Sequence, residues 1–293
     1  MLQILVNAAI YAAEISLIAS GLALSYSILR FANFAHVQYA IVGGYLSYAI
    51  AAAGVPLPLA ILMSCILTGV LAVVIHRLVF HPLEAIAPEG KMIVSWGVAL
   101  VLRSTLAAIF GGAAIFMEVD TEYYVFDSVI ISSLDIAVIA TAVVVMAALH
   151  VLLHRTRLGM GLRALADNRD LAETRGVASE RLVTLMWFIA AGFAALGGTL
   201  FALETRLQPN MDLLIVLPVF AALTLGGLGS VYGAVAGACI LSLAQNIAIG
   251  IDLGELVGGA SFLIPTQFRD VIAVGAMMLV LMLRPRARVG GAR

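Results

Sequence analysis

Apolar residues fill most of this chain, and polar residues gather in short stretches between long apolar runs. A helix needs roughly 20 consecutive apolar residues to cross the hydrocarbon core of a bilayer. Segments close to that length lie at about 4–29, 36–53, 57–80, 92–110, 135–153, 182–203, 213–228, 231–250 and 262–283. The pattern predicts an all-α, polytopic transmembrane helical bundle of about 8–9 spans. Because no change of composition marks a boundary, we expect residues 1–293 to form a single domain.

Composition supports an integral membrane protein. The chain is 63% hydrophobic and 11% charged, with a mean hydropathy of +1.10, which is more apolar surface than a soluble domain can bury. A net charge of −1 gives no basic field for nucleic acid. Cys65 and Cys239 lie in apolar segments, so neither a disulfide framework nor a metal site is expected. The first apolar run is too long for a signal peptide, and we expect it to be a retained span.

A charged segment, residues 154–181, interrupts the apolar pattern with six arginines and four acidic residues. Asp170 and Glu173 have the spacing of a capping box, Gly176 suits the left-handed position that ends a helix, and Ser179 can cap the next helix. We therefore predict two short helices outside the bilayer. Their apolar side would consist of Leu162, Leu165, Leu171 and Val177.

Two interpretations of this charged segment differ in what the leucines do. In the first, the segment is a solvated basic loop that only fixes topology. Such a loop needs no capped helices and no apolar side, so we expect the second, in which a partner packs on this segment. Gly159 and Gly161 interrupt the sequence pattern and would set how the helices leave the membrane span.

The placement of arginine and lysine predicts the orientation of the chain. The charged segment and the arginine-rich tail should be cytoplasmic, whereas the loop 111–135 has five acids and no Lys or Arg and should lie outside. Nine crossings with the N-terminus outside satisfy this distribution. The segment 213–228 is the least secure span, because Pro218 and the glycines of 226–230 can break it.

Few residues inside the predicted spans carry charge. Glu14 and Arg103 are the clear cases, and each is costly to insert unless paired. They could pair with one another, or Arg103 could reach the outer interface. With no second acid evident at similar depth, we expect that Glu14 is not a proton-coupling site. The chain has no phosphate-binding loop and no catalytic motif, so neither enzymatic activity nor a cofactor is expected.

Polar and small residues in the spans are candidates for a translocation path and for close packing. Asn33 is a natural helix cap, His36 at the membrane edge could face a polar cavity, and Gln245 and Asn246 are adjacent amides in an apolar span. Two stripes of small residues recur at four-residue spacing and favour close approach of helices within the subunit, with a subunit interface or path as the alternative. The stripes are Gly229, Gly233 and Gly237, and Ala190, Ala194 and Gly198.

Four sequence strings resemble the LivH-type permease subunits of ABC importers for branched-chain amino acids. They are Asn33–His36, Thr156–Ala164, Ala194–Gly198 and Phe220–Ser230 with Gly233-Ala234. The resemblance implies a bacterial plasma (inner) membrane protein with a second LivM-like permease, two cytoplasmic ATPase subunits and an extracytoplasmic solute-binding protein. It also implies that the charged segment couples the permease to the ATPase. The coupling candidates are Gly159, Gly161, Leu162, Arg163, Leu165, Leu171 and Gly176, and the path candidates are Asn33, His36, Thr224, Gln245 and Asn246.

Glu14 and Val37 depart from the family pattern near the expected path, which leaves the solute open. Related permeases carry urea, short amides or small aromatic carboxylates, so these solutes remain alternatives to branched-chain or other hydrophobic amino acids. An alternative of another class is a stand-alone ion-coupled secondary transporter or channel, which only Glu14 and Arg103 favour.

Overall fold

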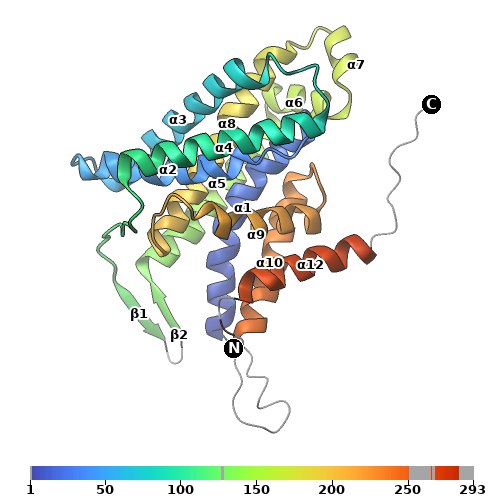
Figure 1. Cartoon of the computed structure of the whole chain (residues 1–293). Coiled ribbons are helices and arrows are strands. Elements are labelled where there is room, and N and C mark those ends of the chain that lie inside the picture. The colour runs from blue at the N-terminus through green and yellow to red at the C-terminus, as the bar shows by residue number, and fades with distance from the viewer. Residues whose placement is uncertain (1, 127–128, 251–264, 266–267, 284–293) are drawn as a thin grey trace.

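The structure is a computed structural model that describes residues 2–126, 129–250, 265 and 268–283. The chain is dominated by helices (Figure 1), as the hydropathy pattern predicts. The helices are α1 (Leu2–Leu29), α2 (Ala35–Ala52), α3 (Leu57–Ile75), the π-helical turn η1 (His76–Phe80), α4 (Pro88–Phe110), α5 (Ser133–Arg155), α6 (Arg157–Asp167), α7 (Arg169–Thr174), α8 (Ser179–Glu204), α9 (Asp212–Gly226), α10 (Val231–Gly250) and α12 (Arg269–Leu283).

Within the described part of the chain, six helices are long and apolar enough to cross a membrane. They are Leu2–Leu29, Leu57–Phe80, Pro88–Phe110, Ser133–Arg155, Ser179–Glu204 and Val231–Gly250. The predicted span 213–228 corresponds to the shorter helix α9, which contains Pro218. The predicted span 262–283 lies partly outside the described residues. The six long apolar helices confirm the prediction of a polytopic helical bundle.

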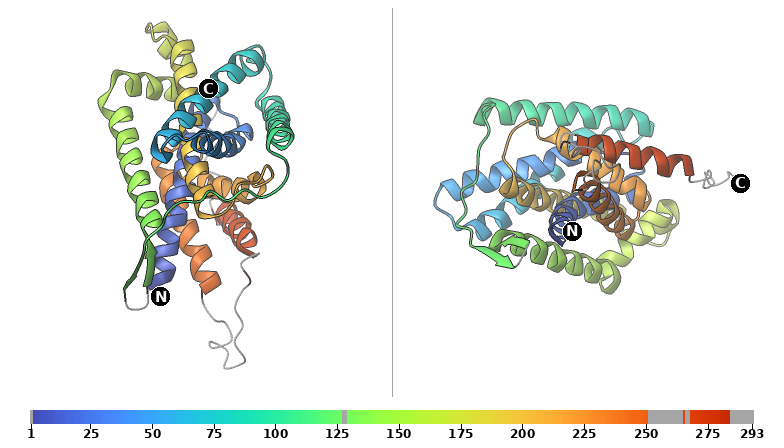
Figure 2. Two further views of the ribbon diagram at one scale, coloured as in Figure 1. Left: turned by 90° about the vertical axis from the view of Figure 1, so that its left-hand side faces the viewer. Right: turned by 90° about the horizontal axis from the view of Figure 1, so that it is seen from below.

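Helices α1 and α8 form the centre of the bundle (Figures 1 and 2). α1 packs against α8 and α10, while α8 also packs against α2 and α3. Small residues make this possible, because a Cβ atom added at Gly43 or Gly198 would collide with the backbone of Ala195 or Ala40. The stripe that contains Gly198 therefore packs within the subunit.

A two-stranded antiparallel hairpin corrects the all-helical expectation. β1 (Tyr123–Phe126) pairs with β2 (Val129–Ser132) inside the predicted outer loop. Aromatic and β-branched residues dominate both strands and favour this structure. The hairpin and the pair α6–α7 lie at opposite ends of the molecule (Figure 1). This arrangement agrees with the opposite sides that the charge pattern predicts for the two segments.

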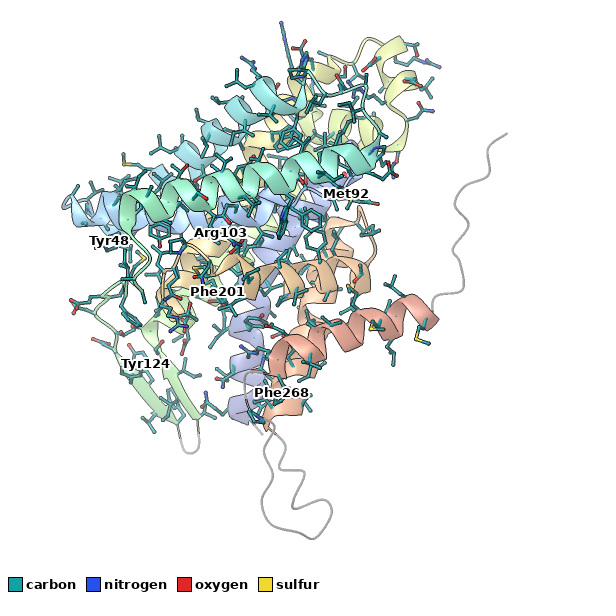
Figure 3. The ribbon with its side chains drawn as sticks, viewed as in Figure 1. Tyr48, Met92, Arg103, Tyr124, Phe201 and Phe268 are labelled. Carbon is teal, nitrogen blue, oxygen red and sulfur yellow. The ribbon has the colours of Figure 1, made fainter. Side chains whose placement is uncertain are left out.

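Many of the side chains that Figure 3 draws as sticks belong to large apolar residues that are exposed. On α4, Ile93 and Val101 are 75% and 66% exposed, and only Ser95, Ala99 and Leu106 of that helix are buried. A soluble protein rarely exposes apolar residues along a whole helix. The surface of α4 is therefore suited to contact with lipid or another membrane helix.

Candidate functional site: the α6–α7 protrusion and the polar core

The charged segment folds into the two predicted short helices, but other residues cap them. The Thr156 hydroxyl accepts a hydrogen bond from the Gly159 N–H at 3.1 Å, and the Asn168 amide accepts one from the Leu171 N–H at 3.0 Å. The capping role predicted for Asp170 is therefore wrong, because α7 begins two residues earlier than that role requires. Ser179 is likewise the first residue of α8 and not its cap. Gly176 has the predicted left-handed conformation, with φ at 82°.

The leucines of the protrusion divide into two groups. Leu162 and Leu165 are 1% and 3% exposed and belong to the core of the permease itself. We expected both to point toward a partner, and the structure corrects this because the apolar side of α6 packs on the permease. Leu171 is 55% exposed, as are Met160 at 54% and Leu158 at 45%. These three side chains remain available to a partner.

Glycines allow the first helix of the protrusion to lie close to its neighbours. A Cβ atom on Gly159 would collide with the backbone of Leu152 and Leu153 near the end of α5. A Cβ atom on Gly161 would lie 2.6 Å from the Leu182 side chain of α8. The two glycines thus fix the angle at which α6 leaves the membrane helix.

Polar contacts fasten the protrusion to the rest of the chain. The Arg30 guanidinium donates to the carbonyl of Ala166 near the end of α6, and Arg30 has the left-handed φ of 57° that non-glycine residues rarely adopt. Arg169 forms ion pairs with Glu84 and with Glu173, the latter at 3.0 Å. The Ser179 hydroxyl and the Arg169 guanidinium hold the pKa of the Glu173 carboxyl below its usual range. These contacts join α6 to the segment that follows α1, and α7 to the loop between η1 and α4.

Two histidines near the protrusion share one tyrosine. The rings of His150 and His154 stack with centroids 4.6 Å apart, and the Tyr232 hydroxyl lies 2.9 Å from Nδ1 of each. His154 and Tyr232 also line a cavity of about 310 Å³ with the coupling candidate Arg163. This network joins α5 to α10 beside α6.

Two path candidates lie at the start of α2. The Asn33 side chain accepts a hydrogen bond from the Ala35 N–H at 3.1 Å, but the cap position of α2 is Phe34, so the predicted cap is wrong by one residue. His36 is 1% exposed, and its Nε2 lies 3.0 Å from the carbonyl oxygen of Ile18 in α1. The prediction that His36 faces a polar cavity is wrong, because the ring fills the space beside Gly21.

The adjacent amides of α10 meet an arginine that the sequence analysis missed. The Gln245 amide donates to the carbonyl of Arg269 at 2.9 Å, and the Arg269 guanidinium donates to the Asn246 amide oxygen at 3.0 Å. That guanidinium also lies 4.3 Å from the centre of the Tyr11 ring. An arginine inside the predicted span 262–283 was the available signal. Thr224 donates within α9, to the carbonyls of Phe220 and Ala221.

The charged residues of the spans have different partners from those we considered. Arg103, labelled on α4 in Figure 3, forms an ion pair with Asp212 at the start of α9. The two side chains are 25% and 10% exposed. A pair of Arg103 with Glu14 is therefore wrong, whereas the position of Arg103 at the outer interface stays a prediction. Glu14 is 3% exposed and close enough to Glu204, Arg269 and Asp135 to interact electrostatically. The assumption that no second acid lies near Glu14 is corrected.

We predict that the Arg103–Asp212 pair stabilises the fold. Removing one partner of a largely buried pair commonly costs about 3–5 kcal/mol, because the other charge loses its compensation. Asp212→Asn and Arg103→Leu should each lower the thermal unfolding midpoint of the purified protein. The exchanged variant Arg103→Asp/Asp212→Arg should recover part of the loss. Equal midpoints for wild type and both single variants would show that the pair contributes nothing.

The glycine stripe of α10 forms a tight hairpin with α9. A Cβ atom on Gly233 would meet the backbone of Gly226, and one on Gly237 would meet the backbone of Ala222. Gly229, in the connection, has φ at 83°. The stripe thus packs within this subunit, which was the favoured interpretation.

The sequence profile of the family described as "branched-chain amino acid transport system / permease component" matches residues 4–282. The chain belongs to this family. The permease BraD of a high-affinity branched-chain amino acid transport system from Pseudomonas aeruginosa is 28% identical, over 99% of this chain and 95% of that protein. A probable branched-chain amino acid transport permease, LivH of Methanocaldococcus jannaschii, is 27% identical, over 98% and 92%.

A solved structure has the same fold as this permease-family chain. PsaBC from Streptococcus pneumoniae, in complex with Fab, superposes with a TM-score of 0.51 at 12% identity. The match covers 97% of this chain and 92% of that chain. It supports the helical architecture without bearing on the solute.

Proposed function

We propose that this chain is the permease subunit of an ABC importer in the bacterial plasma membrane. It forms half of the translocation pathway for branched-chain or other hydrophobic amino acids. A second LivM-like permease forms the other half, two cytoplasmic ATPase subunits drive the cycle, and an extracytoplasmic binding protein delivers the solute. Family membership over residues 4–282 carries the proposal. The chain itself is a transport subunit and not an enzyme.

The geometry of the α6–α7 protrusion supports this mechanism. Its buried leucines and close glycine contacts pack it against α1, α5 and α8, whereas Leu158, Met160 and Leu171 are exposed. An element that is rigid on one side and apolar on the other can transmit motion from a docked subunit. Buried apolar anchors carry most of the energy in such contacts. Alternating access would follow as the ATPase subunits close and open.

The number of spans also belongs to this proposal. Six described helices are long enough to cross the bilayer, and α2, α9 and α12 are the further candidates. With all of them the bundle has the about 8–9 spans that hydropathy predicts. The N-terminus and the hairpin then lie outside, while α6 and α7 lie in the cytoplasm.

The experiment is reconstitution of the permease pair with its ATPase subunits and binding protein in proteoliposomes. Leucine, isoleucine, valine and phenylalanine, loaded on the binding protein, should stimulate ATP hydrolysis and enter the vesicles. Urea, acetamide and benzoate test the alternative solutes in the same assay. Uptake that needs no ATP and follows a pH gradient would overturn the proposal in favour of an ion-coupled transporter.

The variant Glu14→Gln tests the ion-coupled alternative directly. The carboxyl groups of Glu204 and Asp135 near Glu14 are the specific observation that favours proton coupling. If ATP drives import, Glu14→Gln should leave uptake within a few-fold of wild type in both mildly acidic and mildly alkaline buffer. Glu118→Gln in the outer loop is the matched control. A pH-dependent loss of uptake in folded Glu14→Gln protein alone would contradict this expectation.

A further inference from the structure

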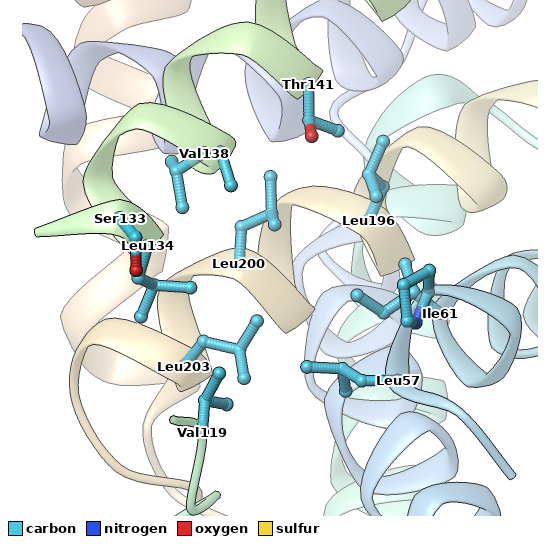
Figure 4. Close-up of a pocket in the computed structure, with 12 residues that line it drawn as sticks. Leu57, Ile61, Val119, Ser133, Leu134, Val138, Thr141, Leu196, Leu200 and Leu203 are labelled. Carbon is cyan, nitrogen blue, oxygen red and sulfur yellow. The ribbon is translucent and has the colours of Figure 1, made fainter. Parts of the chain in front are cut away.

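An apolar groove runs along α8 between α3 and α5. Two cavities of about 370 and 450 Å³ form it, and they share the lining residues Pro58, Ile61, Thr141 and Leu196. In Figure 4, Leu196 and Leu200 of α8 lie between Val138 of α5 and Ile61 of α3. Nearly all of the lining is aliphatic or aromatic. The groove is therefore suited to a hydrocarbon ligand.

The groove continues into a polar pocket near the β1–β2 hairpin. This pocket has a volume of about 550 Å³ and shares Leu134 and Leu203 with the groove. Asp135 and Glu204 line it together with polar side chains, and none of the described residues in its lining is Lys, Arg or His. Glu14 lies close enough to both carboxyl groups, and to Arg269, to interact with them electrostatically. A buried oxygen of Glu204, Oε1, has no hydrogen-bond partner among the described residues.

The combination identifies the chemistry of the occupant. A hydrocarbon chain fits the groove, and a cationic group that donates hydrogen bonds fits the pocket, because charge attraction is stronger near an apolar surface than in water. A packed helix is about 10–12 Å across, so one turn fills roughly 400–600 Å³. Each cavity of the groove has room for only about one turn of a packed helix. A single hydrocarbon chain is narrower than a helix and therefore fits the groove better.

We propose that the groove binds an acyl chain of a membrane phospholipid whose primary amine headgroup lies in the pocket of Asp135 and Glu204. A phosphatidylethanolamine has this chemistry. The amine would donate to the carboxyl groups, while the acyl chain covers the apolar side of α8. Such a lipid would fill the space between α3 and α5 on the same side of the membrane as the hairpin.

The test uses the intact complex in nanodiscs made of equal parts phosphatidylethanolamine, phosphatidylcholine and phosphatidylglycerol with matched acyl chains. Native mass spectrometry then measures which lipids stay bound. Wild type should retain phosphatidylethanolamine several-fold over the other two. Glu204→Gln should abolish that preference, because the pocket loses a charge. Ala137→Leu should lower total retention, because Ala137 lines the groove.

Ala140→Leu is the matched control, since Ala140 is an exposed residue of the same helix that lies outside the groove lining. It should retain lipid like wild type. Retained lipid with the composition of the bulk nanodisc would overturn the proposal. So would efficient cross-linking of Ala137→Cys to another subunit of the complex, because the groove would then hold a protein helix. If Ala137→Leu does not fold, Glu204→Gln still decides the headgroup.

Discussion

Replacing Gly233 with leucine is expected to prevent assembly of an intact complex. A Cβ atom at this position would lie 2.9 Å from the carbonyl carbon of Gly226, and backbone, unlike a side chain, cannot rotate away. Overpacking commonly costs about 1–3 kcal/mol. The cost should be at the upper end here, because Gly226 and Gly233 both belong to the hairpin of α9 and α10. The fold rather than the solute preference should change.

The measurement is the yield of monodisperse complex after gentle solubilisation, together with its thermal midpoint. Gly97→Leu is the matched control, because nothing lies within 4 Å of a Cβ atom at Gly97 in the middle of α4. That variant should assemble like wild type, since leucine has the higher helix propensity. Wild-type yield of the Gly233→Leu complex would contradict the close approach of the two helices.

The helices and the small-residue contacts were predictable because both depend on local periodicity. Each apolar run of sufficient length can satisfy its backbone in a membrane only as a helix or a closed barrel. The four-residue spacing of Gly233 and Gly237 puts them on one helix face before any partner is known, whereas Gly229 precedes α10 and lies in the connection. The hairpin was missed because the acidic residues around it indicated only an outer loop.

Pairings across long sequence separations were not predictable. Arg103 and Asp212 are 109 positions apart, and Asp212 lies between the predicted spans 182–203 and 213–228. Hydropathy likewise cannot say which surface the apolar face of an amphipathic helix packs against. We therefore predicted that Leu162 and Leu165 contact a partner subunit, whereas in the structure they pack on the permease itself. The helix caps differ from the prediction because Asn168 and Asp170 are both competent caps, and tertiary packing decides between them.

Leu171→Asp and Met160→Asp are expected to uncouple the permease from ATP hydrolysis while leaving its fold intact. Both side chains are more than half exposed, so their loss removes little from the permease core. If they fill a groove on an ATPase subunit, a buried charge there removes an apolar anchor and leaves an unpaired carboxylate. Loss of one anchor of at least about 2 kcal/mol lowers affinity roughly 30-fold.

Leu165→Ala should behave in the opposite way. Its side chain is 3% exposed and belongs to the permease core, and truncation of a buried leucine commonly costs about 2–5 kcal/mol. Its thermal midpoint should fall. Arg169→Ala should have a small effect on both ATP coupling and the thermal midpoint, because exposed ion pairs contribute about 0–1 kcal/mol to stability.

Three measurements separate loss of ATPase coupling from loss of stability. They are retention of the ATPase on membranes, solute-stimulated hydrolysis and the thermal midpoint. Val125→Asp in β1 is the control, since Val125 is 67% exposed at the opposite end of the molecule. A solvated loop at α6 and α7 would leave retention and hydrolysis unchanged in Leu171→Asp and Met160→Asp. That result would remove the structural support for ATP coupling through the protrusion. Loss of hydrolysis in these two variants, with normal midpoints and normal Val125→Asp protein, would identify the outward face of α6 and α7 as the ATPase contact.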